Sequence, residues 1–98
     1  MKIYKKVALC GYRQRGKDWY LKLSSLGFEI PYIIERNYEA LSRLPENEGL
    51  YIVGFGEKKS FYESADVILL TGDLPEELMK EALELAGIEV EIVTDIEV

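Results

Sequence analysis

The stretch Lys6-Val7-Ala8-Leu9-Cys10-Gly11-Tyr12-Arg13-Gln14-Arg15-Gly16-Lys17 decides the fold expected for this chain. Its first half is an apolar strand that ends at Cys10, and its second half is a turn bounded by Gly11 and Gly16. An amphipathic segment follows at about 15–26, which predicts a helix that opens from this turn. A strand, a glycine-bounded turn and a helix are typical of the first unit of a parallel α/β sheet.

The rest of the chain alternates short apolar runs with amphipathic segments. Strands are expected at about 3–10, 29–34, 50–55, 67–70 and 89–93. Helices are expected at 15–26, at 37–44, at 58–63 and between Asp73 and Gly87. This alternation predicts a Rossmann-like three-layer α/β domain, in which a five-stranded parallel sheet carries helices on both faces.

The helices also carry expected caps and core-facing stripes. Asp73 is expected to cap the last helix, with Glu76 as its capping-box partner. Asn37 is expected to cap the second helix, and Gly27 to end the first. The stripes expected to face the core are Trp19, Leu23 and Leu26 in the first helix and Leu78, Ala82 and Leu85 in the last.

Length and composition indicate one globular domain, 1–98, because 98 residues with 48% hydrophobic content suit a single core. No apolar run approaches the roughly 20 residues that span a bilayer. The cytoplasm is therefore the expected location, with no membrane partner. One cysteine, Cys10, and no histidine exclude an internal disulfide, a Cys/His zinc site and a Ser-His-Asp triad. Cys10 is expected to be a buried core residue; no catalytic residue, metal ligand or cofactor is predicted.

Charge is unevenly distributed along the chain. Residues 1–22 carry seven basic residues and one acidic residue, a net charge of +6, whereas residues 23–98 sum to −12. The acidic body argues against nucleic acid as a partner. Cations near a helix N-terminus favour a compact anion such as phosphate, although a solvated basic edge is the simpler interpretation.

The turn and Glu35 together suggest a nucleotide site. Glu35 ends the second strand about 20 residues after the turn, where dinucleotide-binding folds place the acid that contacts ribose. In a doubly wound sheet, ligands bind beyond the carboxyl ends of the strands at the topological switch point. That rule should bring together Gly11–Gly16, Glu35 and Thr71–Asp73. Arg13 stands where the fingerprint expects its middle glycine, and its side chain restricts the close approach of the backbone to a pyrophosphate that glycine permits.

A phosphate-binding P-loop is a second pattern that the turn partly matches. Gly11, Gly16 and Lys17 fit its glycines and lysine. The next position needs Ser or Thr to coordinate magnesium, but this chain has Asp18, so an ATP-hydrolysing P-loop is disfavoured.

Three stretches carry a resemblance to a known family: 6–11 with Gly16, Ala65-Asp66-Val67-Ile68-Leu69-Leu70-Thr71-Gly72, and the end 86–98 with Asp95-Ile96-Glu97. Over nearly all of its length the chain resembles the N-terminal domain of the Mur ligases of peptidoglycan synthesis, above all the branch that adds D-glutamate. That resemblance implies a Rossmann-like module that holds the UDP part of a UDP-sugar substrate.

The resemblance also implies a set of contacts. Glu35 and Arg36 match the uridine-contacting pair, and Gly72 matches the glycine after the fourth strand. The full set of expected nucleotide-binding residues is Gly11, Tyr12, Arg13, Gln14, Arg15, Gly16, Lys17, Glu35, Arg36, Thr71, Gly72 and Asp73. Arg13 and Arg15 depart from the family pattern, so their guanidinium groups would either clamp the diphosphate or exclude it.

The family's ATP-binding central domain and amino-acid-binding C-terminal domain have no counterpart in these 98 residues. The chain is therefore expected not to be catalytic alone, and as a fragment it would belong to an ATP-dependent ligase that forms amide bonds. Two alternatives stay open. One is a standalone interaction or assembly domain without a ligand, partnered by another copy or by a catalytic chain, and the other is an NAD(P)-binding regulatory domain.

Overall fold

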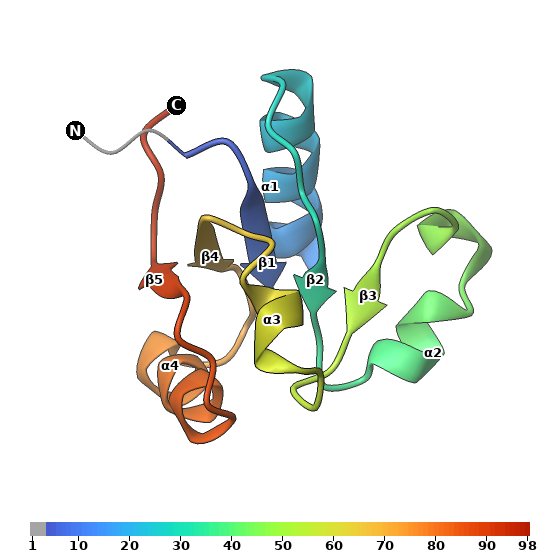
Figure 1. Ribbon diagram of the computed structural model, residues 1–98. Coiled ribbons are helices and arrows are strands. Elements are labelled where there is room, and N and C mark those ends of the chain that lie inside the picture. Colours follow the sequence, from blue (N-terminus) through green and yellow to red (C-terminus); the bar gives the residue numbers. More distant parts are fainter. Residues whose placement is uncertain (1–3) are drawn as a thin grey trace.

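The computed structural model describes residues 4–98, and it contains one parallel sheet flanked by helices (Figure 1). The elements in chain order are β1 (Val7–Cys10), α1 (Gln14–Ser25), β2 (Ile33–Ile34), α2 (Tyr38–Ser42), the 3-10 turn η1 (Pro45–Asn47), β3 (Ile52–Val53), α3 (Lys59–Tyr62), β4 (Val67–Leu70), α4 (Glu76–Leu85) and β5 (Glu91–Val93). The strand order is β3-β2-β1-β4-β5, with every pairing parallel. The predicted Rossmann-like α/β fold is confirmed. Residue 3, the expected start of the first strand, lies outside the described residues.

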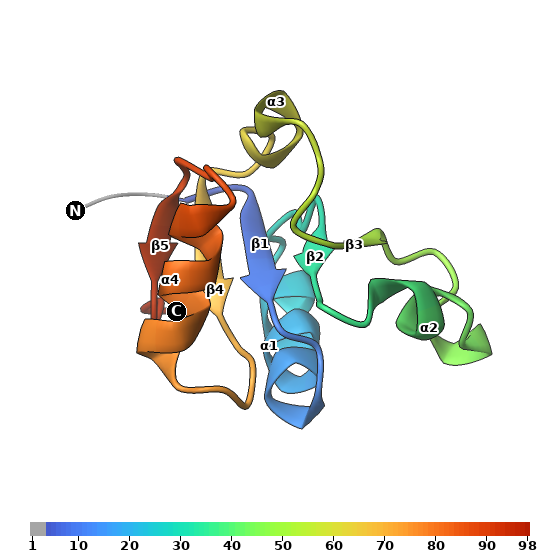
Figure 2. The same cartoon turned by 90° about the horizontal axis from the view of Figure 1, so that it is seen from below.

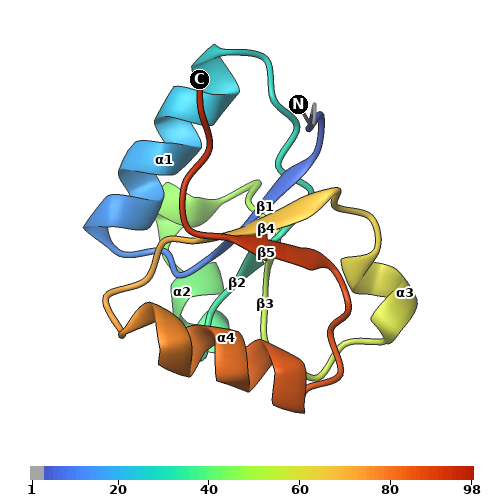
Figure 3. The same cartoon turned by 90° about the vertical axis from the view of Figure 1, so that its left-hand side faces the viewer.

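Both faces of the sheet are covered, as Figure 3 shows with α1 and α4 on opposite sides of the strands. Successive strand residues point to opposite faces, so each strand feeds two cores. The core on the α3 and α4 side takes Ala8, Cys10, Ile34, Val53, Ile68 and Leu70. The core on the α1 side takes Val7, Leu9, Ile33, Ile52, Val67 and Leu69. Continuous apolar runs, rather than alternating ones, therefore encode these strands.

The strands are shorter than the sequence predicts, with β4 as the exception. The second expected strand, 29–34, reduces to β2 and an isolated parallel bridge between Lys6 and Glu29. The β3 to β4 connection carries only the four-residue α3, which Tyr62 anchors by donating its hydroxyl to the Gly54 carbonyl at 2.7 Å. Among residues 4–98, no helix is long and apolar enough to cross a membrane.

The expected caps of α2 and α4 are wrong in their details. α4 begins at Glu76 with Pro75 at the N-cap position and without a side-chain cap, so Asp73 and Glu76 form no capping box. Asn37 does precede α2, but its side chain makes no capping hydrogen bond. In the α4 case the chain turns at Pro75, which places Asp73 too far upstream to reach the first-turn amides.

The core-facing stripe of α4 is also wrong. Met79 and Leu83 are the buried residues of this helix, whereas Leu78 is 54% exposed and Leu85 is 82% exposed. Met79 is held inward because Gly72 leaves the space for it; a Cβ built on Gly72 would lie 2.7 Å from the Met79 sulfur. In α1, Leu23 is buried as expected, but Leu26 is 54% exposed because the helix ends at Ser25.

The β1–α1 turn rests directly on the chain that leaves β4. Gly11 has a φ of +111°, and a Cβ placed on it would lie 2.3 Å from the Gly72 Cα. Gly16 packs under the same turn, since its Cβ would lie 2.2 Å from the Gly11 carbonyl oxygen. Any side chain at these positions would push the two loops apart.

Substituting Gly11 by alanine tests this contact, with Gly49→Ala as the matched control, because Gly49 has a φ of +90° but open space around it. Gly49→Ala should lower the free energy of unfolding by about 1–2 kcal/mol, the cost of positive φ alone. Gly11→Ala should lower it by at least about 3 kcal/mol, since overpacking against Gly72 adds to the strain. Urea unfolding measures both; equal losses would contradict the close approach.

Candidate functional site

Three loops meet at the carboxyl ends of the central strands, where the strand order reverses. The Gly11 amide donates to the Ile34 carbonyl at 2.8 Å, and the Thr71 amide donates to the Cys10 carbonyl at 2.9 Å. The buried Thr71 hydroxyl also donates to the Gly11 carbonyl at 2.7 Å. These bonds fix the β1, β2 and β4 exits relative to one another, as the switch-point rule predicts.

A groove of about 910 Å³ opens beside these loops. Figure 2 shows the two elements that flank it, with α4 on one side and the connection from β2 to α2 on the other. We call it the switch-point groove. Its lining residues are Cys10, Gly11, Arg13, Ile34, Glu35, Arg36, Asn37, Phe55, Gly72, Asp73, Leu74, Leu78, Met79, Glu81, Ala82 and Leu85.

Half of the residues expected to bind nucleotide line this groove. They are Gly11, Arg13, Glu35, Arg36, Gly72 and Asp73. The other half do not line it and are Tyr12, Gln14, Arg15, Gly16, Lys17 and Thr71. Thr71 and Gly16 both contact the Gly11 carbonyl and so stabilise the turn from within. The six lining residues form the surface that a ligand in the groove could contact.

Glu35 already has a structural partner at the end of β2. One carboxylate oxygen of Glu35 accepts a hydrogen bond from the Tyr12 amide at 2.8 Å. The Tyr12 ring is buried and meets Tyr20 edge-on, with ring centroids 6.0 Å apart. A carboxylate can accept about four hydrogen bonds, so Glu35 can hold the turn and still contact a ligand in the groove.

The two arginines of the turn each lie near an acid from the other side of the switch point. Arg13 Nε is 3.6 Å from Asp73 Oδ2, and Arg15 Nη2 is 4.0 Å from Glu76 Oε1. The N-terminus of α1 has no side-chain cap, so its first-turn amides are not satisfied by a capping residue. The positive charge expected at this turn is therefore partly balanced from within the chain.

Cys10 lines the groove at its base, but it is only 4% exposed. Burial, with a smaller contribution from the nearby Glu35 carboxylate, raises the pKa of its thiol from 9.0 to about 12. A thiol with such a pKa stays protonated at neutral pH and is a poor nucleophile. The expectation of a buried core cysteine is confirmed.

The apolar side of the groove was missed at the sequence level. Phe55 lines it after the end of β3, Leu74 from the loop before α4, and Leu78 and Leu85 from α4 itself. The signal was present, since α4 carries two apolar stripes, Met79 with Leu83 and Leu78 with Leu85. One helix needs only one stripe for its core, so the second indicates an apolar surface.

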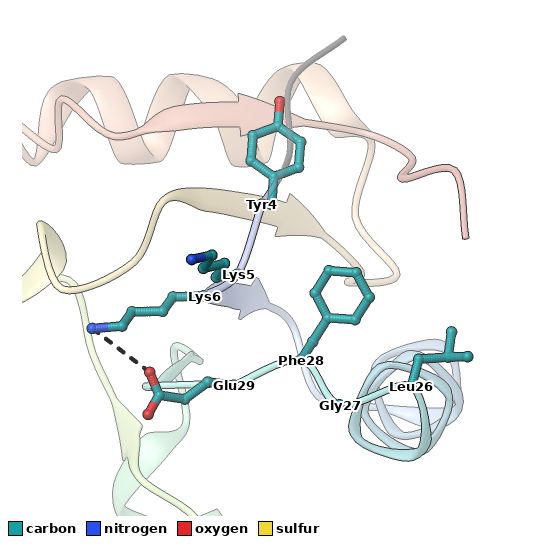
Figure 4. A pocket seen from close by; sticks show the side chains of 7 residues that line it. All are labelled: Tyr4, Lys5, Lys6, Leu26, Gly27, Phe28 and Glu29. Carbon is teal, nitrogen blue, oxygen red and sulfur yellow. Dashed lines mark ion pairs between the residues drawn. The ribbon is translucent and has the colours of Figure 1, made fainter.

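A second cavity, of about 430 Å³, lies at the opposite, amino end of the strands (Figure 4). Its lining residues are Tyr4, Lys5, Lys6, Leu26, Gly27, Phe28 and Glu29. Figure 4 shows the Lys6 ammonium directed at the Glu29 carboxylate, 3.7 Å away. The backbone amides of Lys5 and Lys6 both donate to Asp66 Oδ2. These partners occupy the Lys6 ammonium, the Glu29 carboxylate and both backbone amides without a ligand.

Within residues 4–98, no three His, Cys, Asp or Glu side chains gather in a way that could hold a metal ion. Searches against protein-family models and against curated proteins found no match to this chain. The arguments about function therefore come from the geometry of the groove and from the residues that line it.

The raised pKa of Cys10 predicts a loss of stability in alkali. The unfolded chain loses the thiol proton near pH 9.0, whereas the folded chain keeps it to about pH 12. Over that window the folded state binds more protons, so the free energy of unfolding falls as pH rises, by up to about 1.4 kcal/mol per pH unit. Urea unfolding between pH 8 and 10 should show this slope, and Cys10→Ala should reduce it. An unchanged slope would contradict the buried, protonated thiol.

Proposed function

We propose that this domain binds UDP or a UDP-sugar in the switch-point groove and is not catalytic by itself. The observation that carries the proposal is the shape and lining of that groove. It lies where α/β sheets bind ligands, its base is the glycine contact between Gly11 and Gly72, and it has room for a nucleotide.

The diphosphate is assigned to the end of the groove at the turn. Gly11 and Gly72 line the groove there, with only hydrogen atoms in place of side chains. Arg13 opens onto the same space with a guanidinium that suits phosphate oxygens in bidentate geometry. Of the two outcomes left open for Arg13, the proposal adopts the clamp, because a largely exposed side chain can move aside from the glycines.

The uridine is assigned to the end formed by the β2–α2 connection. The Glu35 carboxylate can accept from the ribose hydroxyls or from the N–H of uracil, in addition to the Tyr12 amide. Arg36 and Asn37 add polar groups beside it, and Phe55 offers an aromatic face. This combination supports the uridine contacts that the Mur resemblance implies for Glu35 and Arg36.

In that reading the domain supplies substrate binding to a peptidoglycan ligase whose ATP-dependent chemistry lies in other domains or in a partner chain. The described residues support this division. Lys17 does not line the groove, and Asp18 follows it where a P-loop has the hydroxyl residue that holds magnesium.

Thermal unfolding with added nucleotide tests the proposal. A ligand at ten times its dissociation constant stabilises by about 1.4 kcal/mol. For a domain of this size that raises the melting temperature by roughly 6–11 °C. We expect millimolar UDP to give such a rise and ATP with magnesium to give none. Glu35→Gln should reduce the UDP effect, whereas Glu39→Gln, on exposed α2, should leave it unchanged.

No shift with UDP or a UDP-sugar would contradict the proposal. A selective rise with NAD(H) instead would favour the dinucleotide-binding alternative. If UDP raised the melting temperatures of the Glu35 and Glu39 variants equally, the assignment of uridine to Glu35 would be wrong, although binding of the diphosphate at the turn would stand.

A second candidate function, an assembly domain, is favoured by the exposed leucines of α4 and of the loop before it. Leu74, Leu78 and Leu85 are each more than half exposed and line one wall of the groove. Contiguous apolar surface of this kind is typical of protein interfaces. If this function is correct, light scattering should show a mass that increases with protein concentration, and Leu85→Lys should abolish the increase. A monomer at every concentration would exclude association between copies.

A further inference from the structure

One ion pair joins two loops that line the switch-point groove. Arg13 comes from the β1–α1 turn and Asp73 from the β4–α4 loop, and both line the groove. Their Nε and Oδ2 atoms are 3.6 Å apart, and their side chains are 77% and 61% exposed. The backbones beneath are locked together by the Gly11–Gly72 contact and the Thr71 hydrogen bond, so the two side chains are held within reach.

This pair is easy to open. Exposed ion pairs contribute little to stability, because water screens them and two long side chains must be ordered. A phosphate offers the same guanidinium a stronger partner, since two oxygens can accept parallel hydrogen bonds. An anion that reaches the turn therefore competes with the Asp73 carboxylate for Arg13.

The neighbouring pair provides an internal contrast. Arg15, in the first turn of α1, lies near Glu76, the first residue of α4, with 4.0 Å between their charged atoms. Neither of them lines the groove. Removing the Glu76 charge thus alters the local field without freeing a group that faces the ligand, which makes it a matched control for Asp73.

We propose that Arg13 and Asp73 form a phosphate-exchange latch, in which Asp73 holds Arg13 in the free protein and the diphosphate of the ligand takes its place. The inference rests on the proposed function for the identity of the ligand, but it applies to any diphosphate that reaches the turn. Asp73 is then a specificity-determining residue. An anion binds at the turn only if its attraction to Arg13 exceeds that of the Asp73 carboxylate. Asp73 also disfavours ligands with additional negative charge near the β4–α4 loop, because like charges repel.

The latch is tested by titration calorimetry at low ionic strength with inorganic pyrophosphate and, separately, with UDP. Asp73→Asn should tighten pyrophosphate binding roughly three- to tenfold, because it frees Arg13 and removes a nearby negative charge. Glu76→Gln should change it by less than about twofold. Arg13→Gln should weaken binding of both ligands. The side chains of Arg13, Asp73 and Glu76 are 77%, 61% and 48% exposed, so unchanged melting temperatures provide a check on folding.

A double-mutant cycle separates the latch from a general field effect. If Asp73 acts through Arg13, then Asp73→Asn should tighten binding by less than about twofold when Arg13 is already glutamine. Equal tightening in both backgrounds would overturn the latch, as would no tightening or no pyrophosphate binding by any variant. Pyrophosphate that responds as expected while UDP does not bind would uphold the latch and overturn the proposed uridine function. UDP binding whose affinity is the same with and without Asp73→Asn would uphold the proposed uridine function and overturn the latch.

Discussion

The close contact between the Gly11 and Gly72 backbones is the constraint on which the rest of this structure depends. Two loops that leave adjacent parallel strands meet with no side chain between them. The contact lets α1 begin directly under the turn, and it leaves the space that Met79 fills from α4. The helices on both faces of the sheet are therefore positioned from one point, and the groove opens beside that point.

The sheet could be predicted from the sequence because its strands are encoded by uninterrupted apolar runs. Val67–Leu70 is buried on both faces and begins and ends at the predicted residues. α1 and α4 also end just before Gly27 and Gly87, as expected, because a glycine stop signal acts within a few residues of the helix end. Local patterns of this kind need no knowledge of distant parts of the chain.

The parts of the site that could not be predicted depend on residues far apart in the sequence. The orientation of α4 was ambiguous because both of its stripes are apolar, and only the hollow at Gly72 selects Met79 for the core. The partner of Arg13 lies 60 positions away, and Asp73 had a plausible local role as a cap. Some basic residues of 1–22 are likewise paired with acids from later in the chain, since Asp73 lies near Arg13 and Glu29 near Lys6.

The reactivity of the Cys10 thiol can report how often the structure around the groove opens. The only thiol in the chain lies at the base of the groove, beneath the turn, and is almost fully shielded. A neutral disulfide reagent can reach it only in molecules that have opened at this site, so the labelling rate reports how often that happens. A ligand seated on the turn would slow labelling in proportion to its occupancy. Binding and local motion at this site can therefore be followed without adding a dye, tag or mutation.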